Sequence, residues 1–186
     1  ERILSDENLA TMLGHAKSKR DDMIVRFFYH TGARIAEVSK VKATHCHSRS
    51  DASVIVQLHG KGGRTRRVVL NLGFSQLLRA FLARIPGNAN LFRGQRGPLT
   101  TSGLRKVIKG IVRRARLNKN ISPHWLRHYF ANTALNHGAK LHHVGQALGH
   151  RSLHSTSIYT HGTLSITEAP SPFLDRSLVL VICKYF

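Results

Sequence analysis

The chain has 186 residues and is 41% hydrophobic, which suffices for one folded domain with a buried core and excludes a largely disordered chain. Its 29 Lys and Arg outnumber its 9 Asp and Glu, and the formal charge of +20 indicates a polyanionic partner, most simply nucleic acid, or a ribosomal-type basic protein. Residues 52–167 hold eighteen Lys and Arg and no carboxylate, which disfavours a two-metal nuclease, so any phosphodiester chemistry must rely on the cations of the protein itself.

The first third of the chain predicts three helices. Ser5 can cap the first, and a second begins near Asp21 and ends at Gly32. A short third helix carries Arg34, which follows a glycine turn and can therefore be aimed into a cleft. Glu37, three residues on, can brace Arg34 through an ion pair, although an ordinary surface pair has the same spacing.

The segment His45-Cys46-His47 resembles part of a metal site. Adjacent residues point in different directions, and no second half of a tetrahedral site is evident, so we expect a loop or surface segment. The two cysteines, Cys46 and Cys183, are far apart in sequence, so neither a disulfide framework nor a zinc ribbon is expected.

A β-hairpin is predicted next, with β-branched strands at residues 54–58 and 65–70 around the glycine-rich turn at 60–63. Lys61 lies at or beside the tip. A lysine on a hairpin can be laid into a groove, but it is more often solvated or a simple phosphate contact. The arginines that we interpret as contacts to a nucleic-acid backbone are Arg64, Arg66 and Arg67.

Two amphipathic helices are predicted after the hairpin, at residues 72–85 and from Thr101 or Ser102 to about residue 115. The outer face of the second is basic and has no acidic neighbour, which favours a phosphate-backbone face over a merely solvated one. Its cations are Arg105, Lys106, Lys109, Arg113, Arg114 and Arg116.

Residues 121–162 contain the densest set of candidate site residues. Ser122 and Pro123 predict a helix start, where free N–H groups and the helix dipole form an anion site. His124 and Arg127 are three apart and project from one face of this helix, which Gly138 ends.

A second helix, at residues 141–148, ends at Gly149 and places His150 just beyond its end. Ser155 can cap a third, short helix that carries Tyr159. Each residue has an ordinary structural explanation by itself, and the combination carries the hypothesis.

The ordered set Arg34, Lys61, His124, Arg127, His150 and Tyr159 resembles the tyrosine recombinase (phage-integrase-like) family. The matching segments cover roughly residues 1–162 and are TGARIAE from Thr31, GKG from Gly60, HWLRHYFA from His124, LGH from Leu148 and YTH from Tyr159. The resemblance implies an α+β, mostly helical DNA breaking-rejoining catalytic domain with a small antiparallel sheet.

The resemblance also implies a metal-free and cofactor-free reaction through a 3′-phosphotyrosyl intermediate. Arg34 and Arg127 would hold the non-bridging oxygens in place of metal ions, and Tyr159 would be the nucleophile. Lys61 would protonate the leaving 5′ oxygen, and His124 and His150 would hydrogen-bond the phosphate. Glu37 would support Arg34.

We expect residues 1–163 to form the catalytic domain and residues 164–186 a C-terminal tail, which could be a strand, a docking segment for another subunit or a tail without a wider role. The N-terminal core-binding domain that completes the clamp around DNA in this family has no counterpart here, so we expect a catalytic fragment. The apolar run at residues 178–183 is too short to span a bilayer, and no secretory signal is present. We therefore expect a cytoplasmic, DNA-associated protein.

Double-stranded DNA is the expected partner, and the full-length enzyme is expected to act as a tetramer in integration or another site-specific recombination. A type IB topoisomerase would use the same chemistry as a monomer, without pairing two sites. A DNA-binding module of the same fold without activity is an alternative of a different class. A zinc protein built on the histidines has the wrong ligand spacing.

Overall fold

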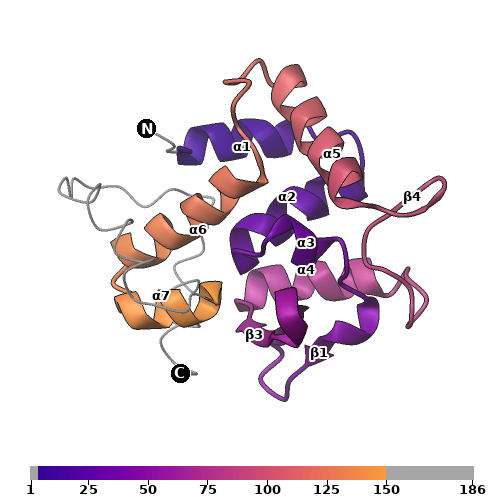
Figure 1. Ribbon diagram of the computed structural model, residues 1–186, viewed down its shortest axis with the longest axis vertical. Helices are drawn as coiled ribbons and strands as arrows, with labels where there is room; N and C mark the ends of the chain where they lie inside the picture. The colour runs from indigo at the N-terminus through magenta and orange to yellow at the C-terminus, as the bar shows by residue number, and fades with distance from the viewer. Residues whose placement is uncertain (1–3, 150–186) are drawn as a thin grey trace.

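The computed structural model of the chain describes residues 4–149. This part forms seven α-helices and two small antiparallel sheets, so the predicted mostly helical α+β fold is confirmed (Figure 1). The helices are α1 (Asp6–Gly14), α2 (Lys19–Thr31), α3 (Ile35–Val38), α4 (Leu72–Leu82), α5 (Thr101–Arg114), α6 (Pro123–Asn136) and α7 (Leu141–Leu148). The strands are β1 (Cys46–Ser48), β2 (Val54–His59), β3 (Thr65–Val69), β4 (Arg93–Gly94) and β5 (Gly97–Pro98). Within residues 4–149, every helix falls short of the length and apolar content that crossing a membrane would require.

Capping residues fix the helix boundaries near the N-terminus. The Ser5 hydroxyl accepts a hydrogen bond from the Asn8 N–H at 3.1 Å and begins α1 as predicted. The start of α2 lies two residues before the predicted one, because Ser18 rather than Asp21 is the N-cap. Gly32, with φ +56°, ends α2 in the left-handed conformation that favours glycine.

The larger sheet has the strand order β1-β2-β3, and β2 and β3 are the predicted hairpin. β1 was expected to be a loop or surface segment. It lies on the surface, but Cys46 pairs opposite Val56 and makes the segment an edge strand rather than a loop. Its exposed residues, such as His47, give it no alternating apolar pattern, which is why the sequence reads as a loop. Burial raises the pKa of the Cys46 thiol to about 12.

The main core surrounds α2, which packs against α1, α4, α5 and α6 and lies in the middle of the fold (Figure 1). Ile24, Phe27 and Phe28 of this helix are completely buried. Phe27 also packs edge-on against Phe92, with the ring centroids 5.4 Å apart. Burial of each such side chain stabilises the fold by roughly 1.5–3 kcal/mol. The segments that surround α2 are therefore held in place by their packing on this helix.

A smaller apolar cluster joins α6 and α7. Phe130 and Ala134 of α6 and Val144 and Leu148 of α7 are all buried in it. This packing holds the C-terminal end of α7 against α6. Because α6 also packs on α2, the ends of α2 and α7 are brought close to one another.

Candidate functional site

The turn between α2 and α3 is shaped by Thr31 and Gly32. The Thr31 hydroxyl accepts a hydrogen bond from the Ala33 N–H at 3.2 Å. A Cβ atom at Gly32 would lie 2.6 Å from Phe130 Cδ1 and 2.9 Å from Leu148 Cδ2. Only glycine fits this conformation and this space, so the turn lies directly against α6 and α7.

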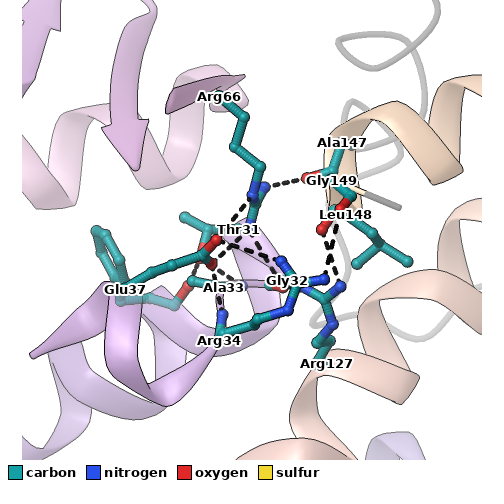
Figure 2. A network of polar contacts seen from close by, with 11 residues as sticks. Thr31, Gly32, Ala33, Arg34, Glu37, Arg66, Arg127, Ala147, Leu148 and Gly149 are labelled. Atoms are coloured by element: carbon teal, nitrogen blue, oxygen red, sulfur yellow. Dashed lines mark hydrogen bonds and ion pairs between the residues drawn. The ribbon is translucent and has the colours of Figure 1, made fainter. Parts of the chain in front are cut away.

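Arg34 stands immediately before α3, with 48% of its side chain exposed. Its backbone N–H donates to Glu37 Oε2 at 2.7 Å, and its Nη1 lies 3.5 Å from Glu37 Oε1. Its Nη2 also donates to the carbonyl oxygen of Gly149 at 3.4 Å (Figure 2). The predicted ion pair is therefore present, but it is long, and the guanidinium of Arg34 stays open to solvent.

Glu37 is a buried carboxylate whose side chain is 3% exposed. Burial alone would raise its pKa, but the hydrogen bonds and positive charge of Arg66, together with those of Arg34, outweigh burial and lower the pKa of Glu37 below its ordinary value. Glu37 is therefore an anion held between two arginines at neutral pH.

Arg127 lies on α6 and is 3% exposed. Its Nη1 donates to the carbonyl oxygen of Gly32 at 2.6 Å, and its Nη2 donates to that of Leu148 at 2.8 Å (Figure 2). Gly32 follows α2, and Leu148 is the last residue of α7. Since carbonyl groups at helix C-termini carry partial negative charge, one guanidinium joins the ends of two helices favourably.

Arg66 was expected to contact DNA, and the structure corrects this expectation. Its side chain is 11% exposed, and its Nη2 lies 2.9 Å from Glu37 Oε2. It also donates to the carbonyl oxygen of Ala147. A guanidinium that is buried and neutralised by a carboxylate does not present its charge to a phosphate backbone.

Three of the six predicted catalytic residues, Arg34, His124 and Arg127, line one cavity of about 470 Å³. The full lining consists of Ala33, Arg34, Ile35, Ala36, Arg105, Ser122, Pro123, His124 and Arg127. The exposed ring of His124 packs edge-on against the ring of His128, with the centroids 4.3 Å apart. A larger cavity of about 730 Å³ lies between α1, α2 and α4 and is lined by other residues.

Of the other three predicted catalytic residues, Lys61 is the one within the described residues. Lys61 is exposed at the tip of the hairpin, in the short 3-10 turn Lys61–Gly63, and is outside the cavity lining. His150 and Tyr159 lie outside the described residues.

The predicted DNA-binding cations on α5 are mostly on the surface. Arg105, Lys106, Lys109 and Arg113 are exposed on its outer face, as Arg64 and Arg67 are on the hairpin. Arg114 is half-buried, and its Nε donates to the carbonyl oxygen of His15 at 3.1 Å. We define the α5 face as Arg105, Lys106, Lys109 and Arg113.

The sequence contained one overlooked signal for the position of Arg66. In a strand, every second residue faces the same side, so Arg66 shares a face with Val68 and Leu70, both buried. Arg66 also pairs opposite Leu58, which is completely buried. The cluster of cations in the hairpin concealed this alternation.

Known proteins are similar to this chain in sequence and in fold. Residues 2–165 match the phage integrase family. Over 187 aligned residues the chain is 34% identical to the tyrosine recombinase XerD of Listeria innocua serovar 6a, covering 95% of this chain and 61% of that protein. The crystal structure of XerA recombinase matches with a TM-score of 0.74 and 28% identity, covering 86% of this chain and 60% of that one. XerH site-specific recombinase bound to its palindromic difH substrate matches with a TM-score of 0.73 and 27% identity. The match covers 87% of this chain and 50% of that one.

The chain thus spans between about half and about three fifths of the length of these proteins. Within that span, the α-helices and the small sheets have the arrangement found in tyrosine recombinases. The family match extends over most of the chain, from before α1 to beyond α7. The sequence and the fold agree, and the chain belongs to the phage integrase family.

Proposed function

We propose that residues 1–163 are the catalytic domain of a site-specific DNA recombinase that cleaves and rejoins DNA without a metal ion. One observation carries the proposal: Arg34, from the turn after α2, lines a single cavity with His124 and Arg127 of α6, which are far from it in sequence. The relatives are named tyrosine recombinases, and XerH was crystallised on its DNA site.

The cavity has the properties of a phosphate site. It is lined by three arginines, Arg34, Arg105 and Arg127, and by the N-terminal residues of α6, where the helix dipole favours an anion. Ser122 is the N-cap residue of α6, yet its side chain accepts no hydrogen bond from the first turn of the helix. The caps of α1, α2, α4 and α5 all accept one. The start of α6 therefore lacks the side-chain cap that these four helices carry.

In the proposed reaction, the phenol of Tyr159 gives up its proton to solvent and its oxygen attacks the scissile phosphorus. A bond from phosphorus to the phenolic oxygen forms as the bond to the 5′ oxygen breaks, and Lys61 donates a proton to the departing 5′ oxygen. Arg34 and Arg127 hold the non-bridging oxygens, whose charge is redistributed in the transition state. Attack of another 5′-hydroxyl on the phosphotyrosyl bond rejoins the strand and releases Tyr159.

Double-stranded DNA is the proposed partner, and the exposed cations of the α5 face and the hairpin contact its backbone. Recombination exchanges strands between two sites, so we propose that the complete enzyme assembles as a tetramer on DNA. Residues 164–186 are proposed to contribute a docking segment to that assembly.

A covalent trapping experiment tests the proposal. The protein is incubated in EDTA with a pool of nicked duplexes of random sequence, and adducts are resolved on a denaturing gel. We expect a 3′-phosphotyrosyl adduct in the wild type. Tyr159→Phe is expected to abolish the adduct and to retain noncovalent binding.

Each other outcome contradicts part of the proposal. Binding without any adduct favours the inactive DNA-binding module. Adducts without sequence preference, together with relaxation of plasmid DNA, favour a type IB topoisomerase. Adducts that form only after addition of Mg²⁺ refute the metal-free mechanism.

A further inference from the structure

Arg66 is the most buried cation of the hairpin strand β3. Its side chain is 11% exposed, whereas Arg64 and Arg67 in the same segment are exposed. The alternation of the strand turns Arg66 toward the interior, on the side of Val68. This location differs from that of the exposed arginines beside it, so Arg66 is expected to have a role other than an ordinary phosphate contact.

The guanidinium of Arg66 contacts three separate segments (Figure 2). It grips Glu37 side-on, with Nε 3.3 Å from Oε1 and Nη2 2.9 Å from Oε2. Nη1 donates to the carbonyl oxygen of Ala147 in α7, and Nη2 approaches that of Gly32 at 3.5 Å. Arg66 thus ties the start of α3, the turn after α2 and the end of α7 together.

Arg34 and Arg127 bind carbonyl groups at the same helix ends as Arg66. Three consecutive carbonyl groups at the end of α7 bind three different arginines. Ala147 accepts from Arg66, Leu148 from Arg127 and Gly149 from Arg34. The Gly32 carbonyl accepts from both Arg66 and Arg127. We call these three arginines, Glu37 and the four carbonyl groups the arginine network.

We propose that Arg66 is a positioning residue, which keeps Arg34 and Arg127 in the geometry that grips the scissile phosphate. This inference rests on the proposed function, because it assigns Arg66 a part in the same cavity without contact to the substrate. Arg66 occupies both carboxylate oxygens of Glu37, so that Arg34 is left with a long and weak ion pair. Arg34 therefore remains available to an incoming phosphate.

Loss of Arg66 would redirect Arg34. The charged groups that face Glu37 are Arg34 at the start of its own helix and Arg66 from β3. Without Arg66, the buried carboxylate would draw the Arg34 guanidinium toward itself and away from the cavity. The end of α7 would also lose a donor to Ala147, which lies beside the carbonyl group that binds Arg127.

A pH profile separates this role from a merely structural one. In Arg66→Gln, burial is no longer opposed by Arg66, so the pKa of Glu37 rises. Lowering the pH then neutralises Glu37 and releases Arg34. We expect the cleavage defect of Arg66→Gln to shrink as the pH falls from about 8 to about 5.5, and the double variant Arg66→Gln/Glu37→Gln to lack this pH dependence.

Arg20 provides a matched control. It also holds one carboxylate, that of Asp21, through Nε at 3.0 Å and Nη2 at 2.8 Å, and it donates to one carbonyl group, that of Arg93, at 2.9 Å. Arg20→Gln therefore removes an equivalent set of contacts away from the cavity. Arg67→Gln is the comparator for loss of a phosphate contact.

The experiment measures single-turnover cleavage of saturating nicked duplex, the DNA dissociation constant against salt, and thermal stability in the full chain. For Arg66→Gln we expect cleavage near pH 8 to fall by about 100-fold, with little change in the dissociation constant or its salt slope. The double variant Arg66→Gln/Glu37→Gln should recover much of the cleavage rate. Arg20→Gln should cleave like the wild type, and Arg67→Gln should weaken binding and reduce the salt slope by about 0.9.

Two results would overturn the inference. Arg66→Gln could weaken DNA binding and reduce the salt slope as Arg67→Gln does, which would make Arg66 a phosphate contact. Its cleavage defect could also be independent of pH and unrelieved by Glu37→Gln, which would make its role only structural. If Arg66→Gln does not fold, Arg66→Lys replaces it, and an intermediate rate with a wild-type dissociation constant is expected.

A measurement without DNA keeps this inference separate from the proposed function. The Nε–H signal of Arg127 in NMR spectra should exchange slowly with solvent in the wild type and in Arg20→Gln, and quickly in Arg66→Gln. If the wild type forms no adduct on any DNA, the proposed function fails while this signal still decides whether Arg66 orders Arg127. An Arg127 signal unchanged by Arg66→Gln would refute the positioning role.

Discussion

The arginine network and the α5 face use the same kind of charge in opposite ways. In the arginine network, Arg66 and Arg127 are 11% and 3% exposed and are bound to a carboxylate and to helix-end carbonyl groups. On the α5 face, the four cations are exposed to solvent. Solvent and salt screen exposed charges, whereas buried donors keep a fixed direction.

The difference in exposure suits the two groups of cations to two roles, DNA affinity and the placement of hydrogen-bond donors. Exposed cations release counterions from DNA and supply affinity that depends on salt and not on geometry. Buried cations cost free energy to desolvate, and their value lies in the fixed placement of hydrogen-bond donors. Substitutions in the two regions should therefore change different measured quantities.

The largest effect is expected for Arg127→Gln. This change removes the charged donor from the carbonyl group of Leu148 and leaves that of Gly32 with the 3.5 Å contact from Arg66, so the free energy of unfolding should fall by about 2–4 kcal/mol. Cleavage should fall by about 10²- to 10³-fold if the same group stabilises the transition state. Urea unfolding and single-turnover cleavage measure the two effects, and a wild-type cleavage rate would remove Arg127 from the mechanism.

An effect on stability of similar size is expected for Gly32→Ala. Its φ of +56° strains any other residue, and the new Cβ would overlap Phe130 and Leu148, so we expect a loss of about 2–4 kcal/mol. Gly138→Ala is the control, because Gly138 has φ +88° with open space around it. It should cost only the strain, about 1–2 kcal/mol. Equal losses in the two variants would show that close contact with α6 and α7 does not matter.

The dependence of stability on pH should carry the signature of Glu37. Its folded-state pKa is lowered, so below its ordinary pKa of 4.5 the unfolded state binds a proton that the folded state does not. Its contribution to stability is therefore complete above about pH 5 and is lost as the pH falls through the folded-state pKa. Chemical unfolding between about pH 3 and about pH 7 should show a smaller acid-side decline in Glu37→Gln. Identical profiles would contradict the lowered pKa.

The smallest effects are expected on the α5 face. Lys106→Gln and Lys109→Gln should each leave the free energy of unfolding within about 0.5 kcal/mol of the wild type, because both side chains are exposed. Each should weaken DNA binding by a few fold and reduce the slope of log K against log salt by about 0.9. Fluorescence anisotropy over a salt series measures both. A salt slope unchanged by both substitutions would place DNA on another face.

Local signals in the sequence predicted much of the fold. Ser5, Gly32 and Gly149 mark helix ends through capping and left-handed conformations that depend on neighbouring residues only. The hairpin followed from two β-branched segments around a glycine turn. The edge strand beginning at Cys46 was missed, because three residues on a sheet edge carry no periodic pattern of their own.

The site was predicted less completely, for a physical reason. The sequence motifs identified Arg34, His124 and Arg127, and the structure brings these into one cavity. The location of Arg66 in the interior depends on the register of β3 against β2, and its partner Ala147 lies 81 residues away. Contacts of that kind leave no mark on local composition.

The three successive carbonyl acceptors at the end of α7 have a thermodynamic consequence. Ala147, Leu148 and Gly149 directly precede His150, and the chain continues from there to Tyr159. Under the proposed function, phosphate that competes with these carbonyl groups for Arg34 or Arg127 alters the free energy of the end of α7, from which the chain continues to Tyr159. By reciprocity, a second ligand that shifts the end of α7 alters the affinity for phosphate by the same factor.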